Sequence, residues 1–263
     1  MMKKIGEKKG QVTIFIIIAV LLVAMVILFF IFRDSLPSEI GGTKKQANPS
    51  AFIQGCLENE IKTIVDKLAL QGGSINPKHY ILYQGERIEY LCYTNEYYKP
   101  CVMQQPLLDS HVEKEIKNAI QAETRNCFNS MKDAYEKQNY NVDLSPGDIT
   151  VELLPKRIIT KFDYNLVLTK DSSKRYDSFS VILNNNLYEL VSITSSILNS
   201  EAKYGDTETT FYMDIYRNLK IEKQKQTEGS TIYILTNTDN GEKFQFASRS
   251  IAWPPGFGGL NNE

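Results

Sequence analysis

The chain has 263 residues, of which 42% are hydrophobic and 23% are charged, and its formal net charge is −1. This composition is close to the average of globular proteins and excludes a wholly disordered, collagen-like or coiled-coil chain. Because 30 basic residues balance 31 acidic ones, the chain has no bulk basicity for nucleic-acid binding. The length allows one sizeable domain, and the 2 histidines provide few groups for zinc ligation or acid–base catalysis.

Near the N-terminus, residues 14–32 form an unbroken run of 19 apolar residues without glycine or proline. As a helix this run would extend about 28 Å, close to the thickness of the hydrocarbon core of a bilayer. A buried helix of a soluble domain is the alternative, but such a helix keeps one polar stripe. We therefore predict a transmembrane helix over residues 11–33 that meets lipid through residues 14–32, preceded by a cytoplasmic basic leader over residues 1–10.

The charges that flank the apolar run predict its orientation. Four lysines and one acid precede the run, whereas Arg33 and Asp34 follow it and cancel. Lysine-rich flanks stay in the cytoplasm, so residues 34–263 are expected on the outer side of a single-pass cell membrane protein. A cleaved secretory signal is the alternative, but its apolar region is shorter and ends in small residues, unlike residues 33–37 here.

The residues directly before the apolar run form a short motif. Lys8-Lys9-Gly10-Gln11-Val12-Thr13 resembles the signal of type IV pilins, especially the archaeal class III form. This resemblance implies that a prepilin peptidase is a partner and cleaves between Gly10 and Gln11. It covers about the first 32 residues. Many pilins have Glu at the fifth mature position, which is Phe15 in this chain.

Two later stretches are similar to uncharacterised surface proteins of small-genome archaea that share this leader. They are residues 56–73, which end in Leu-Gln-Gly-Gly, and residues 244–247, Phe-Gln-Phe-Ala. The resemblance implies an archaeal cell surface and no particular chemistry.

A linker is predicted over residues 34–50, which contain two prolines and a Gly-Gly pair. From Ala51 the apolar residues recur at steps of three and four, which predicts a helix with Ser50 as its N-cap and a stop at Gly72-Gly73. Pilins usually continue the membrane helix into the head domain. The break therefore favours a domain that is tethered to the membrane.

Residues 51–252 are predicted to form one α+β domain that mixes helices with antiparallel sheets, and residues 253–263 a Pro/Gly-rich tail. The further helices are expected at 107–137, 184–202 and 209–219. The strands are expected at 80–84, 87–93, 149–154, 157–162, 164–169, 176–183, 231–237 and 243–250. The last two strands form the clearest hairpin, because Asn240-Gly241 accepts the positive φ of a tight turn.

All four cysteines follow the apolar run, and an even count in an oxidising compartment favours disulfides. Spacing alone permits three connectivities. Turn-forming residues between Cys92 and Cys101 favour a small closed loop, whereas Cys56 and Cys127 each lie on the apolar stripe of a predicted helix. We therefore favour the pairs Cys92–Cys101 and Cys56–Cys127.

Patterns that would indicate catalysis or a cofactor are weak. No close cysteine pair is present and His111 has no second histidine at zinc-ligand spacing, so we expect no metal and no other cofactor. A thiol enzyme would need a free cysteine near His79 or His111, which the even count disfavours. No nucleophile elbow, phosphate loop or dinucleotide fingerprint occurs. Solvated helix faces account for the acids at helical spacing, which are Glu58, Glu60, Glu113 and Glu115.

Six tyrosines lie between Tyr80 and Tyr98. Ordinary strand packing explains most of them, but Tyr97 and Tyr98 fall inside the expected disulfide loop and are the two most favoured to face outward. Exposed tyrosines stack on sugars or anchor protein partners. These two residues are therefore the candidate binding surface.

Three functions stay open. We favour a non-enzymatic, membrane-anchored cell-surface protein whose disulfide-stapled ectodomain serves binding, adhesion or envelope structure, with a surface protein or a glycan as ligand and no nucleic-acid partner. The second is a subunit that self-associates into a type IV pilus-like filament. The third is an exported enzyme held at the membrane.

Overall fold

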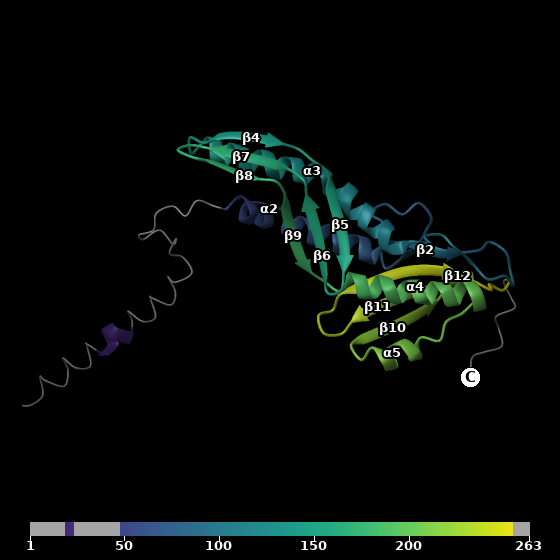
Figure 1. Ribbon diagram of the computed structural model, residues 1–263. Coiled ribbons are helices and arrows are strands. Elements are labelled where there is room, and N and C mark those ends of the chain that lie inside the picture. Colours follow the sequence, from purple (N-terminus) through teal and green to yellow (C-terminus); the bar gives the residue numbers. More distant parts are fainter. Residues whose placement is uncertain (1–18, 24–47, 255–263) are drawn as a thin grey trace, which may run out of the picture. The chain divides into compact units, whose positions relative to one another are not determined.

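The computed structural model describes residues 19–23 and 48–254 (Figure 1). The chain divides into two units, Met1–Gln46 and Ala47–Glu263. Residues 19–23 are helical. The rest of the apolar run, the leader with Gly10 and Gln11, and the linker up to residue 47 lie outside the described residues. Within the described ranges, no helix is both long enough and apolar enough to cross a membrane.

The second unit begins with helix α2 (Pro49–Leu70). Its N-cap is Asn48, whose side chain accepts the Ser50 N–H at 3.1 Å. The expectation of Ser50 as N-cap was wrong by two residues, because proline has a preset φ that suits the first helical position. The helix stops where expected, since Gly72 adopts a φ of +84° that continues no helix.

Two other helices match their expected positions, and one is shorter. Helix α3 (Leu108–Glu136) follows the predicted range closely, and α4 (Leu187–Tyr204) starts three residues later than expected, after Asn185 and Asn186. Helix α5 (Thr210–Ile215) was expected to reach residue 219. It ends early because residues from Leu219 onward pair with a neighbouring strand along seven positions instead.

The middle of the chain forms two three-stranded antiparallel sheets, with orders β4-β7-β8 and β5-β6-β9. Strand β4 leads into β5, β6 into β7 and β8 into β9, so the two sheets follow one another along one meander (Figure 1). The meander is interrupted where β4 gives way to β5. Gly147 lies at this break, and a Cβ there would lie 1.9 Å from the Asp163 carbonyl oxygen. The strands are β4 (Asn141–Ser145), β5 (Ile149–Leu154), β6 (Arg157–Phe162), β7 (Asn165–Thr169), β8 (Ser173–Tyr176) and β9 (Phe179–Asn184).

The larger sheet has six strands in the order β1-β2-β12-β11-β10, with β3 beside β2. All its pairs are antiparallel except β12 with β2, which is parallel. The β11–β12 hairpin is present as predicted, and Gly241 in its turn has a φ of +77°. The strands are β1 (Tyr80–Tyr83), β2 (Glu86–Tyr93), β3 (Val102–Met103), β10 (Leu219–Lys225), β11 (Ser230–Asn237) and β12 (Lys243–Arg249). The α+β class is therefore correct, with this one parallel pair as an addition.

Four strands were missed from the sequence, namely β3, β4, β8 and β10. Strand β8 has the sequence Ser-Lys-Arg-Tyr and β10 reads Leu-Lys-Ile-Glu-Lys-Gln-Lys. Neither run has the apolar content that marks a strand by itself. Both acquire strand geometry from hydrogen bonding to an apolar neighbour, β7 for β8 and β11 for β10.

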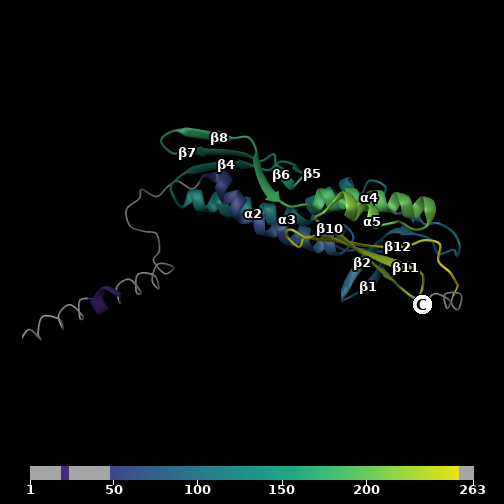
Figure 2. The ribbon, with the colours of Figure 1, turned by 90° about the horizontal axis from the view of Figure 1, so that it is seen from below.

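Helices α2 and α3 run side by side (Figure 2) and are joined by the disulfide Cys56–Cys127. Helix α2 contacts β9 of the meander and β12 of the larger sheet, and α4 also contacts β12. Phe128 on α3 stacks on Tyr164 with ring centroids 4.1 Å apart and meets Phe162 and Phe179 edge to face. One continuous core therefore reaches from the helix pair into the meander of β4 to β9.

The two disulfides should differ in their contribution to stability. Cys56–Cys127 spans 71 residues and Cys92–Cys101 spans 9. Loop-closure entropy predicts that replacing both cysteines by alanine lowers the free energy of unfolding by about 4 kcal/mol for the long loop and about 2.5 kcal/mol for the short one. Denaturant titration of the two double variants in detergent measures both values. A larger loss for the short loop would contradict the entropic account.

Candidate functional site

The structure contains the two disulfides that the sequence favoured, Cys56–Cys127 and Cys92–Cys101, and no cysteine is free. No thiol is therefore available to His79 or His111. His79 instead packs against Tyr90, with ring centroids 4.7 Å apart. Cys92 is the penultimate residue of β2, so the second disulfide closes the loop that follows this strand.

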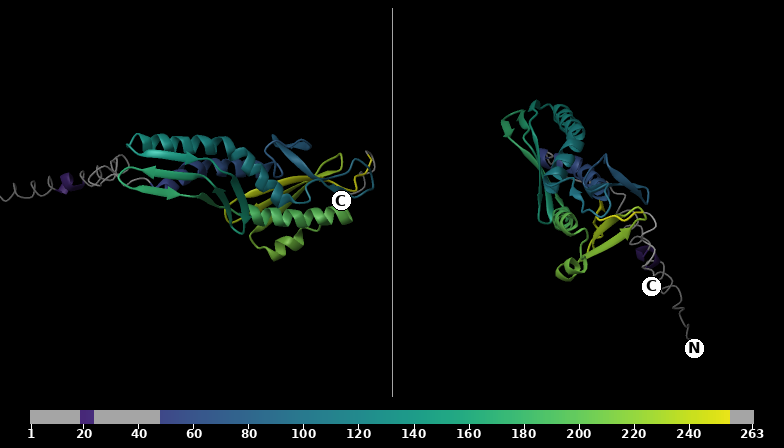
Figure 3. Two further views of the ribbon diagram at one scale, coloured as in Figure 1. Left: turned by 45° about the horizontal axis from the view of Figure 1, so that its top comes forward. Right: turned by 90° about the vertical axis from the view of Figure 1, so that its right-hand side faces the viewer.

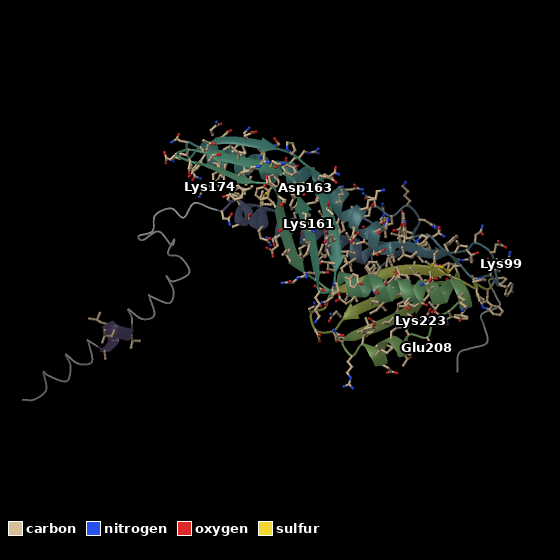
Figure 4. All side chains as sticks on the ribbon, in the orientation of Figure 1. Lys99, Lys161, Asp163, Lys174, Glu208 and Lys223 are labelled. Atoms are coloured by element: carbon tan, nitrogen blue, oxygen red, sulfur yellow. A yellow bond between two sulfur atoms is a disulfide. The ribbon has the colours of Figure 1, made fainter. Side chains whose placement is uncertain are left out.

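That loop contains Tyr97 and Tyr98, which are 42% and 50% exposed. It lies at the end of the unit marked by Lys99 in Figure 4, whereas α2 begins toward the other end (Figures 3 and 4). The guanidinium carbon of Arg249 lies 5.4 Å from the centroid of the Tyr97 ring. The loop therefore presents partly exposed tyrosines at the end of the unit farthest from the start of its first helix.

The chain after β12 packs directly on this loop. Ile251 donates its N–H to the Lys99 carbonyl at 2.8 Å, and Ala252 accepts the Tyr98 N–H at 3.0 Å. Trp253 meets the Tyr98 ring edge to face, with centroids 5.0 Å apart. These contacts attach Trp253, the first residue of the predicted Pro/Gly-rich tail, to the loop. Residues 255–263 lie outside the described part of the chain.

Two glycines make room for the same segment. A Cβ on Gly205 would lie 2.0 Å from Ile251 Cδ1, and a Cβ on Gly229 would lie 2.6 Å from the Ala252 Cβ. Gly205 also ends α4 with a φ of +80°. The segment that leads to Trp253 is thus enclosed by the disulfide loop on one side and by these two glycine turns on the other.

We call this region the tip and define it by four exposed aromatic residues, Tyr97, Tyr98, Tyr204 and Trp253. A cavity of about 280 Å³ opens beside Tyr204 and Trp253. Its lining includes Glu201, Asp206, Lys225, Gln226 and Thr231. The sequence indicated Tyr97 and Tyr98 as exposed. Tyr204 and Trp253 had no such signal, because they come from α4 and from the segment after β12.

A buried carboxyl group supports the floor of this cavity. Glu201 is 3% exposed, accepts the Tyr233 hydroxyl and also accepts the Ser248 hydroxyl at 2.9 Å. Its main-chain carbonyl accepts the Ser250 hydroxyl at 3.0 Å. Burial raises the pKa of Glu201 above its ordinary value, and the hydroxyl donors only partly offset this effect. These bonds tie α4 to β11, to β12 and to the segment that ends in Trp253.

A second polar cluster joins Ser74, Glu89 and His111. The Ser74 hydroxyl donates to Glu89 and lies 2.8 Å from His111 Nε2. In a serine hydrolase the histidine lies between the serine and the acid, whereas here the serine lies between the other two and is only 5% exposed. Burial raises the pKa of Glu89 and lowers that of His111. The cluster satisfies buried polar groups where the loop after α2 meets β2 and α3.

Two acids on α3 were expected to be merely solvated, and this was wrong. Glu113 accepts the Leu153 N–H at 2.9 Å, and Glu115 accepts the Ile75 N–H at 2.9 Å. Both therefore attach other elements to the helix. Within residues 19–23 and 48–254, no group of three or more His, Cys, Asp and Glu side chains could hold a metal ion.

No protein-family model, curated protein or solved structure matches this chain. The residues themselves have to indicate the function, and among the described clusters the tip combines exposed aromatic rings with an adjacent polar cavity.

Glu201 predicts a pH dependence of stability. Because its folded pKa lies above the ordinary 4.5, the folded state binds more protons between the two pKa values, and the free energy of unfolding falls as pH rises through that interval. Glu201→Gln removes this contribution. Relative to the variant, the wild-type protein should therefore lose stability as pH rises above about 4.5, as measured by denaturant titration at several pH values.

The control is Glu208→Gln, an exposed acid whose pKa is lowered by hydrogen bonds with Thr210. The contribution of Glu208 to stability is lost as pH falls. Relative to Glu208→Gln, the wild-type protein should therefore lose stability toward low pH, and by less than the change that Glu201 produces. Superimposable profiles for wild type and Glu201→Gln would show that the buried carboxyl does not titrate differently on folding.

Proposed function

We propose that the protein is a non-enzymatic, membrane-anchored cell-surface protein whose disulfide-stapled domain presents the tip as a binding surface. The observation that carries the proposal is the pairing of all four cysteines in a domain that follows the apolar run of residues 14–32. Disulfides persist outside the cytosol, so paired cysteines support export.

The apolar run supports an anchor. Its described part, residues 19–23, is helical, and Val20, Leu21, Leu22 and Val23 are each more than half exposed within their unit. Consecutive exposed apolar side chains around a helix are stable when lipid covers them. The lysines before residue 14 support an orientation in which the folded domain lies outside the cell.

The arrangement within the folded unit supports binding as the role. The described part of this unit begins at Asn48, and the tip lies at the end marked by Lys99 (Figure 4). A tether attached at the Asn48 end leaves the aromatic residues of the tip, at the other end, free to meet another surface. Exposed tyrosine and tryptophan are enriched where proteins bind partners, because a rigid ring offers contact area at low entropic cost.

A pilus-like filament subunit is the second candidate, favoured by the motif around Gly10 and Gln11. In such an assembly the apolar helices would pack together in a filament core instead of staying dispersed in lipid. Shearing of intact source cells, followed by fractionation, distinguishes a filament subunit from a membrane-anchored protein. Recovery of the protein mainly in sheared filaments supports the second candidate, and recovery in membranes supports the first.

Topology is testable with protease added to intact source cells. The lysine asymmetry around residues 14–32 predicts that the domain lies outside the cell. The protease should therefore either digest the residues beyond 34 or cut the linker and release the folded domain from the membrane. A cytoplasmic protein in the same cells serves as the control for leakage. Complete protection of the domain until lysis would reverse the proposed orientation.

Processing is testable by one substitution and a matched control. If a prepilin peptidase cleaves after Gly10, the mature wild-type chain begins at Gln11. Gly10→Leu should block cleavage because a site that accepts glycine has no room for a branched side chain. Gly6→Leu introduces the same side chain within the leader and should leave cleavage unchanged. Intact-mass measurement reads both variants. A wild-type mass that still includes residues 1–10 would leave an uncut anchor, and loss of residues 1–10 from Gly10→Leu would contradict the need for glycine.

A further inference from the structure

Two of the aromatic rings of the tip line one cavity. Tyr204 is the last residue of α4 and is 66% exposed, and Trp253 follows β12 and is 55% exposed. Both contribute to the cavity of about 280 Å³. Each ring is supported by a neighbour, since Lys203 Nζ lies 4.8 Å from the Tyr204 centroid and Tyr98 meets Trp253 edge to face. The remaining ring surface is open to a ligand.

Polar side chains surround the same cavity. Asp206, Lys225, Gln226 and Thr231 all belong to its lining. Asp206 uses Oδ1 for the Thr207 N–H at 2.8 Å and for the Lys223 ammonium group, so Oδ2 is the oxygen that can accept from a ligand. Carboxylate, ammonium, amide and hydroxyl groups together both donate and accept hydrogen bonds. The cavity thus suits a ligand with many hydroxyl groups and some apolar surface.

The charges at the tip favour an uncharged ligand. Asp206 pairs with Lys223, and Lys99 pairs with Glu96. Arg249 donates to the main-chain carbonyls of Thr94 and Glu228. Lys225 also lines the cavity. Both signs are therefore present around it, and most of the charged groups named here have partners, which favours a neutral ligand.

The site is held in place before any ligand arrives. The loop closed by Cys92–Cys101 holds the segment before Trp253 through the Ile251 N–H and the Ala252 carbonyl, the Glu201 carbonyl accepts the Ser250 hydroxyl, and Ile251 packs on Gly205. A preformed site lowers the conformational entropy that binding would otherwise cost.

We propose that this cavity binds a neutral saccharide, with Trp253 and Tyr204 packing on the apolar faces of the sugar rings and Asp206 and Gln226 bonding the hydroxyl groups. The inference rests on the proposed function, because a saccharide of the cell exterior meets the tip only if the domain is exported. A protein partner fits less well, since stable protein interfaces bury on the order of 800 Å² per partner, whereas the tip offers a small concave site lined by polar groups.

The sequence supplies a site-specific probe, because Trp253 is the only tryptophan in the chain. Its fluorescence, excited at wavelengths that tyrosine does not absorb, therefore reports on the tip alone. The full chain in detergent is titrated with neutral hexoses, deoxyhexoses, pentoses and N-acetylhexosamines, each as a monosaccharide and a short oligosaccharide. We expect a saturable change in Trp253 emission with at least one class of sugar, and the same affinity by calorimetry.

Variants assign the binding to the cavity. Tyr204→Ala should weaken the affinity about tenfold or more, as truncation of a central aromatic contact does. By calorimetry, Trp253→Ala should do the same and Trp253→Phe should retain part of the affinity, since a ring remains. Phe211→Ala is the matched control, because Phe211 is an aromatic residue with 62% exposure that does not line the cavity.

Unchanged emission across the whole panel would overturn the saccharide proposal, as would an affinity that survives Tyr204→Ala and Trp253→Ala in folded protein. A change in emission caused by peptides and by no sugar would also overturn it and assign the tip to a protein partner. Because these measurements use detergent-solubilised protein, they are independent of location. Failure of the export proposal would appear in the protease experiment instead.

Discussion

Helix α2 has to bury its apolar side against two different sheets, and the rest of the unit depends on this constraint. Its buried side chains recur along the whole helix and include Ile53, Leu57, Ile61, Val65 and Leu68. Each contributes about 1.5–3 kcal/mol when removed from water. Because α2 contacts both β9 and β12, it holds the meander and the larger sheet in one core. The bond from Cys56 to Cys127 keeps α3 beside it.

The tip follows from the one parallel strand pair. Strands β2 and β12 are parallel neighbours, so their carboxyl ends lie at the same edge of the sheet. The loop closed by Cys92–Cys101 leaves one of these ends, and the segment from Ser250 to Trp253 leaves the other. Two stretches about 150 residues apart in sequence therefore meet, and the hydrogen bond that the Cys101 N–H donates to the Ser250 hydroxyl oxygen, at 2.9 Å, is part of that contact.

Buried polar groups connect the elements that hydrophobic packing brings together. The Glu201 carboxyl group joins α4 to Tyr233 on β11 and Ser248 on β12, while Ser74 joins the loop after α2 to Glu89 on β2 and to α3 through His111. A buried polar atom that loses its partner costs more than an apolar contact of the same size. Such bonds therefore determine which arrangement of the elements is stable. They explain why the tip keeps a defined shape although its aromatic residues are exposed.

Features that depend on neighbours along the chain could be read from the sequence. Apolar periodicity located α2 and α3, and Asn240-Gly241 located the β11–β12 hairpin, because each signal lies within the element that it specifies. The charged run β10 is a strand only because the fold pairs it with β11, which supplies its geometry. The fold also places Trp253 at the tip, since that position depends on the parallel pairing of β12 with β2, a long-range contact for which no local residue pattern exists.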